Sequence, residues 1–205
     1  MRKVALSILC LCPLLLASCQ SPRPTTSSAR DYQTLGKEPQ RDTDTAHKQN
    51  DAAVTLINKG DYAGAEKLLR EALADDVMYG PAHNNLGLIY FHQSKLYLAA
   101  WEFQYASKLM PTQPEARNNL GLVFEASGKL DQAIDAYDQA IKIAPDNAQF
   151  IGNCARARMR RGDKFADVRP LLEKLVTLDT RPDWTAWAKE HLALVQRAAT
   201  QASLP

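Results

Sequence analysis

The chain has 205 residues, 45% of them hydrophobic and 23% charged, and its formal net charge is +2. This length suits one domain with an appendage, since a folded part of roughly 150 residues buries about 70% of its unfolded surface. A disulfide scaffold is therefore unnecessary, and a charge so close to balance excludes an electrostatic nucleic-acid partner.

The first segment, MRKVALSILCLCPLLLASC, has the layout of an export signal. Arg2 and Lys3 precede an apolar run over residues 4–16, which is too short to span a membrane as a helix. Removing residues 1–18 leaves equal numbers of basic and acidic residues. It also leaves Cys154 as the one cysteine beyond Cys19, so no intramolecular disulfide is expected in the exported domain.

The ending LASC resembles the bacterial lipobox, in which the signal is cut before a cysteine that then carries the lipid. The resemblance implies a signal peptide over residues 1–18 and a lipid anchor, of the palmitate kind, on Cys19. Because Gln20 follows rather than Asp, it also implies an outer-membrane address facing the periplasm of a Gram-negative cell. An ordinary signal with a chance cysteine is the alternative.

Residues 19–45 are rich in Ser, Thr, Pro and charge and nearly lack large aliphatic residues. Such a segment cannot bury enough surface to offset its ordering entropy, which predicts a disordered tether. As a flexible coil it would reach roughly 30 Å, enough to hold a domain just off a membrane surface.

From residue 46 the chain repeats itself every 34 residues, which predicts a stack of antiparallel helix pairs. Small residues recur after the first helix of each pair, where a tight turn is needed, at Gly60, Ser94, Gly128 and Gly162. Small residues also recur on the first helices, at Ala53, Gly87, Gly121 and Ala155, where they let the paired helix approach closely. On the second helices the large residues Leu69, Phe103 and Tyr137 recur between alanines. Alternating small and large residues make an interlocking seam.

This pattern resembles the tetratricopeptide repeat. Its signature W-x-x-L-G-x-x-Y, followed by A-x-x-x-F and Pro, is matched in two tandem units, except that His83 and Arg117 replace the Trp. The matching residues are Leu86, Gly87, Tyr90, Ala99, Phe103 and Pro111, then Leu120, Gly121, Phe124, Ala133, Tyr137 and Pro145.

The predicted fold is all-α: an α-solenoid of about four such units with a C-terminal capping helix. The fourth unit takes one extra residue near GDKFADV, and Trp184 and Trp187 lie on the apolar stripe of the capping helix, which is more typical of core than of a ligand site. The units are predicted at 46–79, 80–113, 114–147 and 148–182, and the cap at 183–199.

The resemblance implies that the first helices line a concave groove, into which repeat positions five, six, nine, twelve and thirteen point. Position five is Asn in three units and position six is Asn in three, so that an asparagine ladder follows the groove. An Asn amide can hold both polar groups of a peptide unit, but the same amides can instead bond helix to helix. The predicted peptide-binding groove consists of Asn50, Asn84, Asn85, Leu88, Phe91, Asn118, Asn119, Leu122, Asn153, Arg156 and Arg160.

The two arginines fall on one helix face with Asn153, where they can pair with an acidic side chain or a terminal carboxylate, although a solvated basic face is the more common arrangement. We expect no enzyme, no metal and no cofactor. His47, His83, His92 and His191 have no Cys, Ser or acid at a spacing that forms a known catalytic or metal set, and Cys154 is predicted to be buried core.

The sequence therefore predicts a membrane-anchored, non-enzymatic adaptor that binds a protein or peptide segment and no small-molecule substrate, in pilus or secretion-system assembly or in cell-envelope maintenance. The alternative is a structural envelope protein that associates with itself and leaves the groove empty. The sequence leaves the partner and the oligomeric state open.

Overall fold

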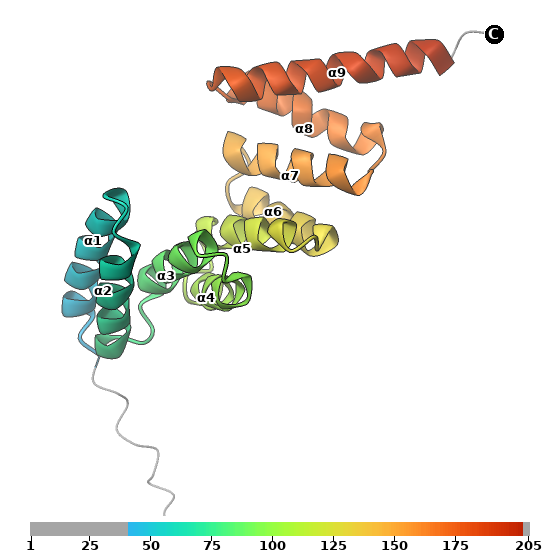
Figure 1. Ribbon diagram of the computed structural model, residues 1–205. Coiled ribbons are helices and arrows are strands. Elements are labelled where there is room, and N and C mark those ends of the chain that lie inside the picture. The colour runs from blue at the N-terminus through green and yellow to red at the C-terminus, as the bar shows by residue number, and fades with distance from the viewer. Residues whose placement is uncertain (1–40, 203–205) are drawn as a thin grey trace, which may run out of the picture. The chain divides into compact units, whose positions relative to one another are not determined.

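The computed structural model describes residues 41–202, with side chains up to Leu194, and this part of the chain consists of helices joined by short turns (Figure 1). The predicted signal, Cys19 and the tether as far as residue 40 lie outside the described residues. Within them the predicted all-α fold is confirmed, and the helices are α1 (Thr43–Asn58), α2 (Tyr62–Asp75), α3 (Gly80–His92), α4 (Leu96–Leu109), α5 (Glu115–Ala126), α6 (Leu130–Ile143), α7 (Ala148–Arg161), α8 (Phe165–Leu178) and α9 (Pro182–Ala202).

The turns between paired helices explain the small residues that recur there. Gly60, Gly128 and Gly162 have φ angles of 79°, 73° and 87°, and Ser94 has a φ of 59°. This left-handed conformation is the one that an L side chain resists, because its Cβ crowds the following carbonyl oxygen. A turn with this backbone reverses the chain in three residues and lays each second helix antiparallel to its first.

Close contact between paired helices explains the small residues on the first helices. A Cβ on Gly87 would lie 2.7 Å from the Phe103 ring, and one on Gly121 would overlap the Tyr137 ring. Both rings are buried, as are the alanines that alternate with them on α4 and α6. The seam predicted from the 34-residue spacing is therefore the packing core of the stack.

The fourth pair and α9 close the stack at its C-terminal end. The second helix α8 begins one residue later than the repeat alone would place it, which accommodates the extra residue in GDKFADV. Val168, Leu172 and Leu175 of α8 are fully buried, and Trp184 and Trp187 of α9 pack against this cluster.

At the N-terminal end the folded part starts earlier than the sequence predicted. Asp42 caps α1, which begins at Thr43, three residues ahead of the expected boundary. Arg41 donates two hydrogen bonds to Asp76 at the end of α2, at 2.7 and 3.0 Å, and Thr43 donates a third at 2.8 Å. Residues 41–45 therefore belong to the first helix pair and not to the tether, because a buried carboxylate holds them.

The contacts between pairs decide which helices share a surface. The first helices α1, α3, α5 and α7 touch one another in sequence, whereas consecutive second helices make at most marginal contact. The first helices thus form one surface, which we call the amide face after its asparagines, and the second helices lie behind it. Among the described residues no helix is both long and apolar enough to cross a bilayer.

Candidate functional site

The asparagines of the amide face pair with one another across consecutive repeats. Position six of each later unit donates from Nδ2 to the Oδ1 of position five in the preceding unit, 35 residues earlier. The three pairs are Asn85 to Asn50 at 2.8 Å, Asn119 to Asn84 at 3.1 Å, and Asn153 to Asn118 at 2.9 Å. Each such pair is one rung of a ladder that runs along the first helices.

The sequence left two roles open for these asparagines, holding a peptide or bonding one helix to another, and the rungs bear on both. The amides do bond helix to helix, so part of their purpose is to hold neighbouring repeats in register. Asn50, Asn118 and Asn153 are buried, while Asn84, Asn85 and Asn119 are only partly covered. Asn84 uses only its oxygen and Asn85 only its nitrogen in these bonds, so both keep hydrogen-bonding capacity that faces the accessible side.

A buried carboxylate joins α5 to α6 and α7 at the end of the ladder. Glu125 accepts hydrogen bonds from Tyr137 at 2.8 Å, from Arg156 at 3.0 and 3.1 Å, and from Arg160 at 2.8 Å. Burial works to raise the pKa of the Glu125 carboxyl, but the bonds from Arg156, Arg160 and Tyr137 outweigh it and hold that pKa below its ordinary value.

The Glu125 cluster changes what is expected of the two arginines. The sequence predicted that Arg156 and Arg160 pair with an acidic ligand, but the structure supplies their carboxylate from within the chain. The side chain of Arg160 is still 52% exposed and that of Arg156 34% exposed, so both can take part in a second contact. Position twelve is acidic only in the third unit, at Glu125. This acid is the sequence signal that could have identified the pairing of Glu125 with the two arginines.

Beside Arg156, the first two turns of α9 place two tryptophans next to the amide face. The Trp184 ring lies on Gly152, where an added Cβ would be 2.7 Å from it, and thus covers position five of the fourth unit. The guanidiniums of Arg156 and Arg181 approach the same ring, at 5.5 and 5.1 Å from its centroid. Trp187 meets Trp184 edge to face, with 5.7 Å between the ring centroids.

These side chains enclose a hollow that the sequence did not predict. It has a volume of about 270 Å³ and is lined by Arg156, Asp183, Trp184 and Trp187, and we call it the anchor pocket. The tryptophans were assigned to the core from their helical spacing, and Trp184 and Trp187 do contact it, but each is only partly buried. Spacing alone could not show which edge of each ring remains accessible.

The predicted apolar positions of the groove are covered to about the same degree as its part-exposed amides. Leu88, Phe91 and Leu122 are partly buried and pack against the core clusters of their own repeats. The first half of the amide face therefore carries partly exposed apolar side chains as well as partly exposed amides.

The remaining candidates for chemistry have structural roles. His83 bonds Glu102 at 2.6 Å and the Val77 carbonyl oxygen at 2.9 Å, and so links α3 to its neighbours. Cys154 is buried, as predicted, and burial raises the pKa of its thiol to about 12. Across residues 41–202 no three His, Cys, Asp or Glu side chains come together as a metal site would require.

The repeated helix pairs, their glycine seam and the surface of first helices define an α-solenoid interaction domain. Two profiles described as tetratricopeptide repeat match the sequence, over residues 50–114 and 114–147. Residues 50–147 are therefore tetratricopeptide repeats, a kind of domain that binds protein or peptide partners. No curated protein matches the sequence significantly.

Solved structures share this fold at low sequence identity. The Pseudomonas aeruginosa pilF protein is 20% identical, with a TM-score of 0.68 over 81% of this chain and 73% of that one. A structure of MamA is 22% identical, with a TM-score of 0.57 over 74% of this chain and 82% of that one. The first repeat domain of Spaghetti, bound to an HSP90 peptide, is 18% identical, with a TM-score of 0.58 over 60% of this chain and 98% of that one.

Proposed function

We propose that this protein is a membrane-anchored adaptor that captures an extended segment of a partner protein on its amide face. The observation that carries the proposal is the set of part-exposed amides, Asn84, Asn85 and Asn119, held in fixed register by the rungs. An amide whose orientation is fixed in advance loses little entropy when it bonds a peptide backbone.

The anchor pocket supports the same proposal. It opens beside the last rung, so a segment that follows the amides can place one apolar or aromatic side chain between Trp184 and Trp187. The rungs do not read side chains, and the pocket therefore supplies the selectivity. A few net hydrogen bonds of about 1 kcal/mol each and one apolar anchor correspond to an affinity in the micromolar range.

The anchoring and the address rest on the sequence. We propose that Cys19 carries the lipid and that the tether holds the repeats on the periplasmic side of the outer membrane. The partner is proposed to be a component of a pilus, of a secretion system or of cell-envelope maintenance, because the fold is shared with pilF. If Cys19 is the anchor, Cys19→Ser removes the protein from the membrane fraction and abolishes labelling by radioactive palmitate.

Binding to an array of unstructured peptides tests the capture. We expect micromolar binding to a subset of peptides that share one apolar residue, and a loss of at least about tenfold in Asn85→Ala and in Trp187→Ala. Leu194→Ala, which trims another exposed side chain of α9, serves as the control. Equal binding by all four proteins would refute the proposal, and thermal melts exclude unfolding as the cause of a loss.

A further inference from the structure

The two charged side chains that line the anchor pocket differ in how the fold satisfies them. Arg156 is held from within the chain, since it donates to Glu125 at 3.0 and 3.1 Å and to Asn153 at 3.3 Å. Asp183 lines the pocket from α9 and is exposed, and its side chain has no hydrogen bond or ion pair with any other residue that the structure describes. Its carboxylate oxygens therefore depend on water as their donor.

This difference affects which side chain can fill the pocket. A ligand seated beside Trp184 and Trp187 displaces water from the walls, and a carboxylate that loses water without gaining a new donor is destabilised. Arg156 loses less, because Glu125 and Asn153 stay bonded to it. The pocket therefore favours a ligand that brings a hydrogen-bond donor to Asp183 over one that brings an acceptor to Arg156.

The charges closest to the pocket are one cation in excess and one anion. Arg156 and Arg160 share the single carboxylate of Glu125, which leaves one positive charge unmatched in that group. Asp183 contributes one negative charge. A cationic side chain in the pocket is repelled by the two arginines and an anionic one by Asp183. Either charge would also lose water on entering, so an uncharged side chain is favoured.

Neighbouring charged groups on and before α9 do not change this balance. Arg181, which approaches the Trp184 ring, is paired with Asp179. Farther along α9, Lys189 and Glu190 are both exposed and have opposite charges. The surroundings of the pocket therefore add no net charge that would select a cation or an anion.

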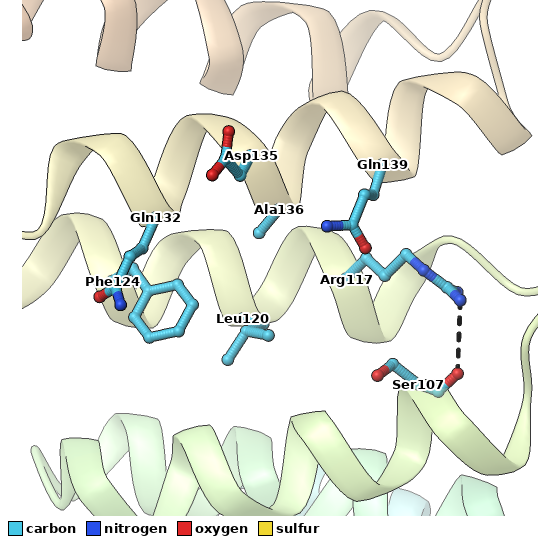
Figure 2. Close-up of a pocket in the computed structure, with 8 residues that line it drawn as sticks. All are labelled: Ser107, Arg117, Leu120, Phe124, Gln132, Asp135, Ala136 and Gln139. Atoms are coloured by element: carbon cyan, nitrogen blue, oxygen red, sulfur yellow. Dashed lines mark hydrogen bonds between the residues drawn. The ribbon is translucent and has the colours of Figure 1, made fainter.

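A hollow of similar size among α4, α5 and α6 lacks this combination of groups. It measures about 220 Å³ and is lined by Ser107, Arg117, Leu120, Phe124, Gln132, Asp135, Ala136 and Gln139 (Figure 2). Figure 2 shows its cation, Arg117, turned towards the Ser107 carbonyl oxygen, and its one aromatic ring is Phe124. A flat side chain placed there meets a single ring, whereas in the anchor pocket it meets two.

We propose that the anchor pocket takes an aromatic side chain that carries a hydrogen-bond donor, tyrosine or tryptophan, whose O–H or N–H bonds Asp183. The ring packs against Trp184 and Trp187, in the edge or offset contacts that aromatic pairs prefer. At about 270 Å³ the hollow is smaller than the roughly 300–1,000 Å³ of sites for whole small-molecule ligands, so it suits one side chain. This inference rests on the proposed capture of an extended segment, and it names the residue that such a segment must contain.

The N-acetyl amides of tyrosine, tryptophan, phenylalanine, leucine, lysine and glutamate test the pocket without the rest of a segment. They are titrated into the chain from Gln20 onward, which keeps every described residue, and the indole N–H signals of Trp184 and Trp187 are followed by NMR. We expect millimolar binding of the tyrosine and tryptophan amides, about tenfold tighter than that of the phenylalanine amide, the effect of one hydrogen bond to a charged group. The other three amides should bind more weakly, and the Phe124 signals should stay unchanged.

Asp183→Ala separates the donor bond from the rest of the pocket. This variant should bind the tyrosine amide about tenfold more weakly and the phenylalanine amide at least as tightly as the wild type does. Glu190→Ala is the matched control, since it removes another exposed acid of α9 that does not line the pocket. Thermal melts of both variants exclude unfolding of α9 as the cause of a loss.

The outcomes separate this inference from the capture on which it rests. Equal binding of the tyrosine and phenylalanine amides, or a preference for tyrosine that survives Asp183→Ala, overturns the inference and leaves capture by the rungs standing, because Asn85→Ala tests that capture. Tightest binding of the lysine or glutamate amide overturns it in favour of a charged ligand. If no amide shifts the tryptophan signals, the hollow is not an anchor site and the inference fails.

Discussion

Asn153 donates a 2.9 Å hydrogen bond to Asn118, and both side chains are almost fully buried, at 4% and 2% exposure. Neither amide can reach water in exchange for this partner. The rung between the third and fourth units is therefore the one that most affects stability, whereas the rungs with part-exposed members can contribute to binding as well.

Asn118→Ala is expected to lower the free energy of unfolding by about 1–3 kcal/mol, because it leaves the buried Asn153 amide without an acceptor. Asn85→Ala should cost less, since Asn85 is partly exposed and water can replace it. Urea unfolding followed by circular dichroism measures both. Equal losses in the two variants would contradict the assigned burial.

Glu125→Gln should reduce stability at neutral pH by about 2 kcal/mol, because the variant keeps Arg156 and Arg160 and removes their shared charge. The folded-state pKa of Glu125 lies below that of the unfolded chain, so the unfolded state binds more protons in acid. The wild-type contribution is complete above about pH 4.3 and is lost as the pH falls through the folded-state value. Unfolding curves of the two proteins should converge in acid; a constant gap between them would show that Glu125 is not responsible.

Ser94→Gly is expected to stabilise the protein by about 0.5–1 kcal/mol, since glycine adopts the left-handed backbone of this turn without the clash that serine has. Ser127→Gly makes the same chemical change at a φ of −84°, and it also removes a 2.8 Å bond to the Val123 carbonyl oxygen. That control should lose stability. Thermal melting compares the two, and a gain in both would mean that backbone conformation is not the cause.

Gly121→Ala is expected to destabilise the protein by about 1–3 kcal/mol, despite the better helix propensity of alanine, because the new methyl group would overlap the Tyr137 ring. Gly80→Ala offers a comparison with a smaller expected loss, since its methyl group would meet the unbranched Met110 side chain at 2.7 Å and Leu109 Cβ at 3.2 Å instead of an aromatic ring. If both substitutions cost the same in chemical denaturation, the seam is looser than the structure indicates.

Cys154 should be inert towards thiol reagents at pH 8 while the protein is folded, because it is buried and its thiol pKa is raised to about 12. Absorbance after addition of an aromatic disulfide reagent should develop only at the rate of unfolding, and urea should make the reaction immediate. Prompt modification of the native protein would show that α7 opens locally.

The sequence predicted the fold through features that repeat locally. Gly60 and Gly128 mark turns and Gly87 and Gly121 mark close contacts, and each acts within its own helix pair, so the 34-residue spacing is sufficient to find them. The position of the tether's end was missed because Asp76, which holds Arg41, lies at the far end of α2.

The site was harder to predict because its contacts join different repeats. The rungs connect residues 35 apart, which is one more than the repeat, so aligned positions never meet their actual partners. Glu125 reaches Arg156 and Arg160 for the same reason, and Trp184 reaches Gly152 from outside the repeat pattern. Such contacts depend on how one pair is rotated against the next, which no single repeat encodes.

Every rung runs from a donor at position six to an acceptor at position five of the preceding unit. This direction decides which repeats could be added or removed without breaking the ladder. The second and third units each carry both an acceptor at position five and a donor at position six, so copying residues 114–147 would insert a module that joins its neighbours on both sides. The first unit has Asp51 in place of the donor, and the fourth has Gly152, covered by Trp184, in place of the acceptor. The asparagine ladder therefore starts in the first unit and stops in the fourth, because neither end unit carries the side chain that would extend it.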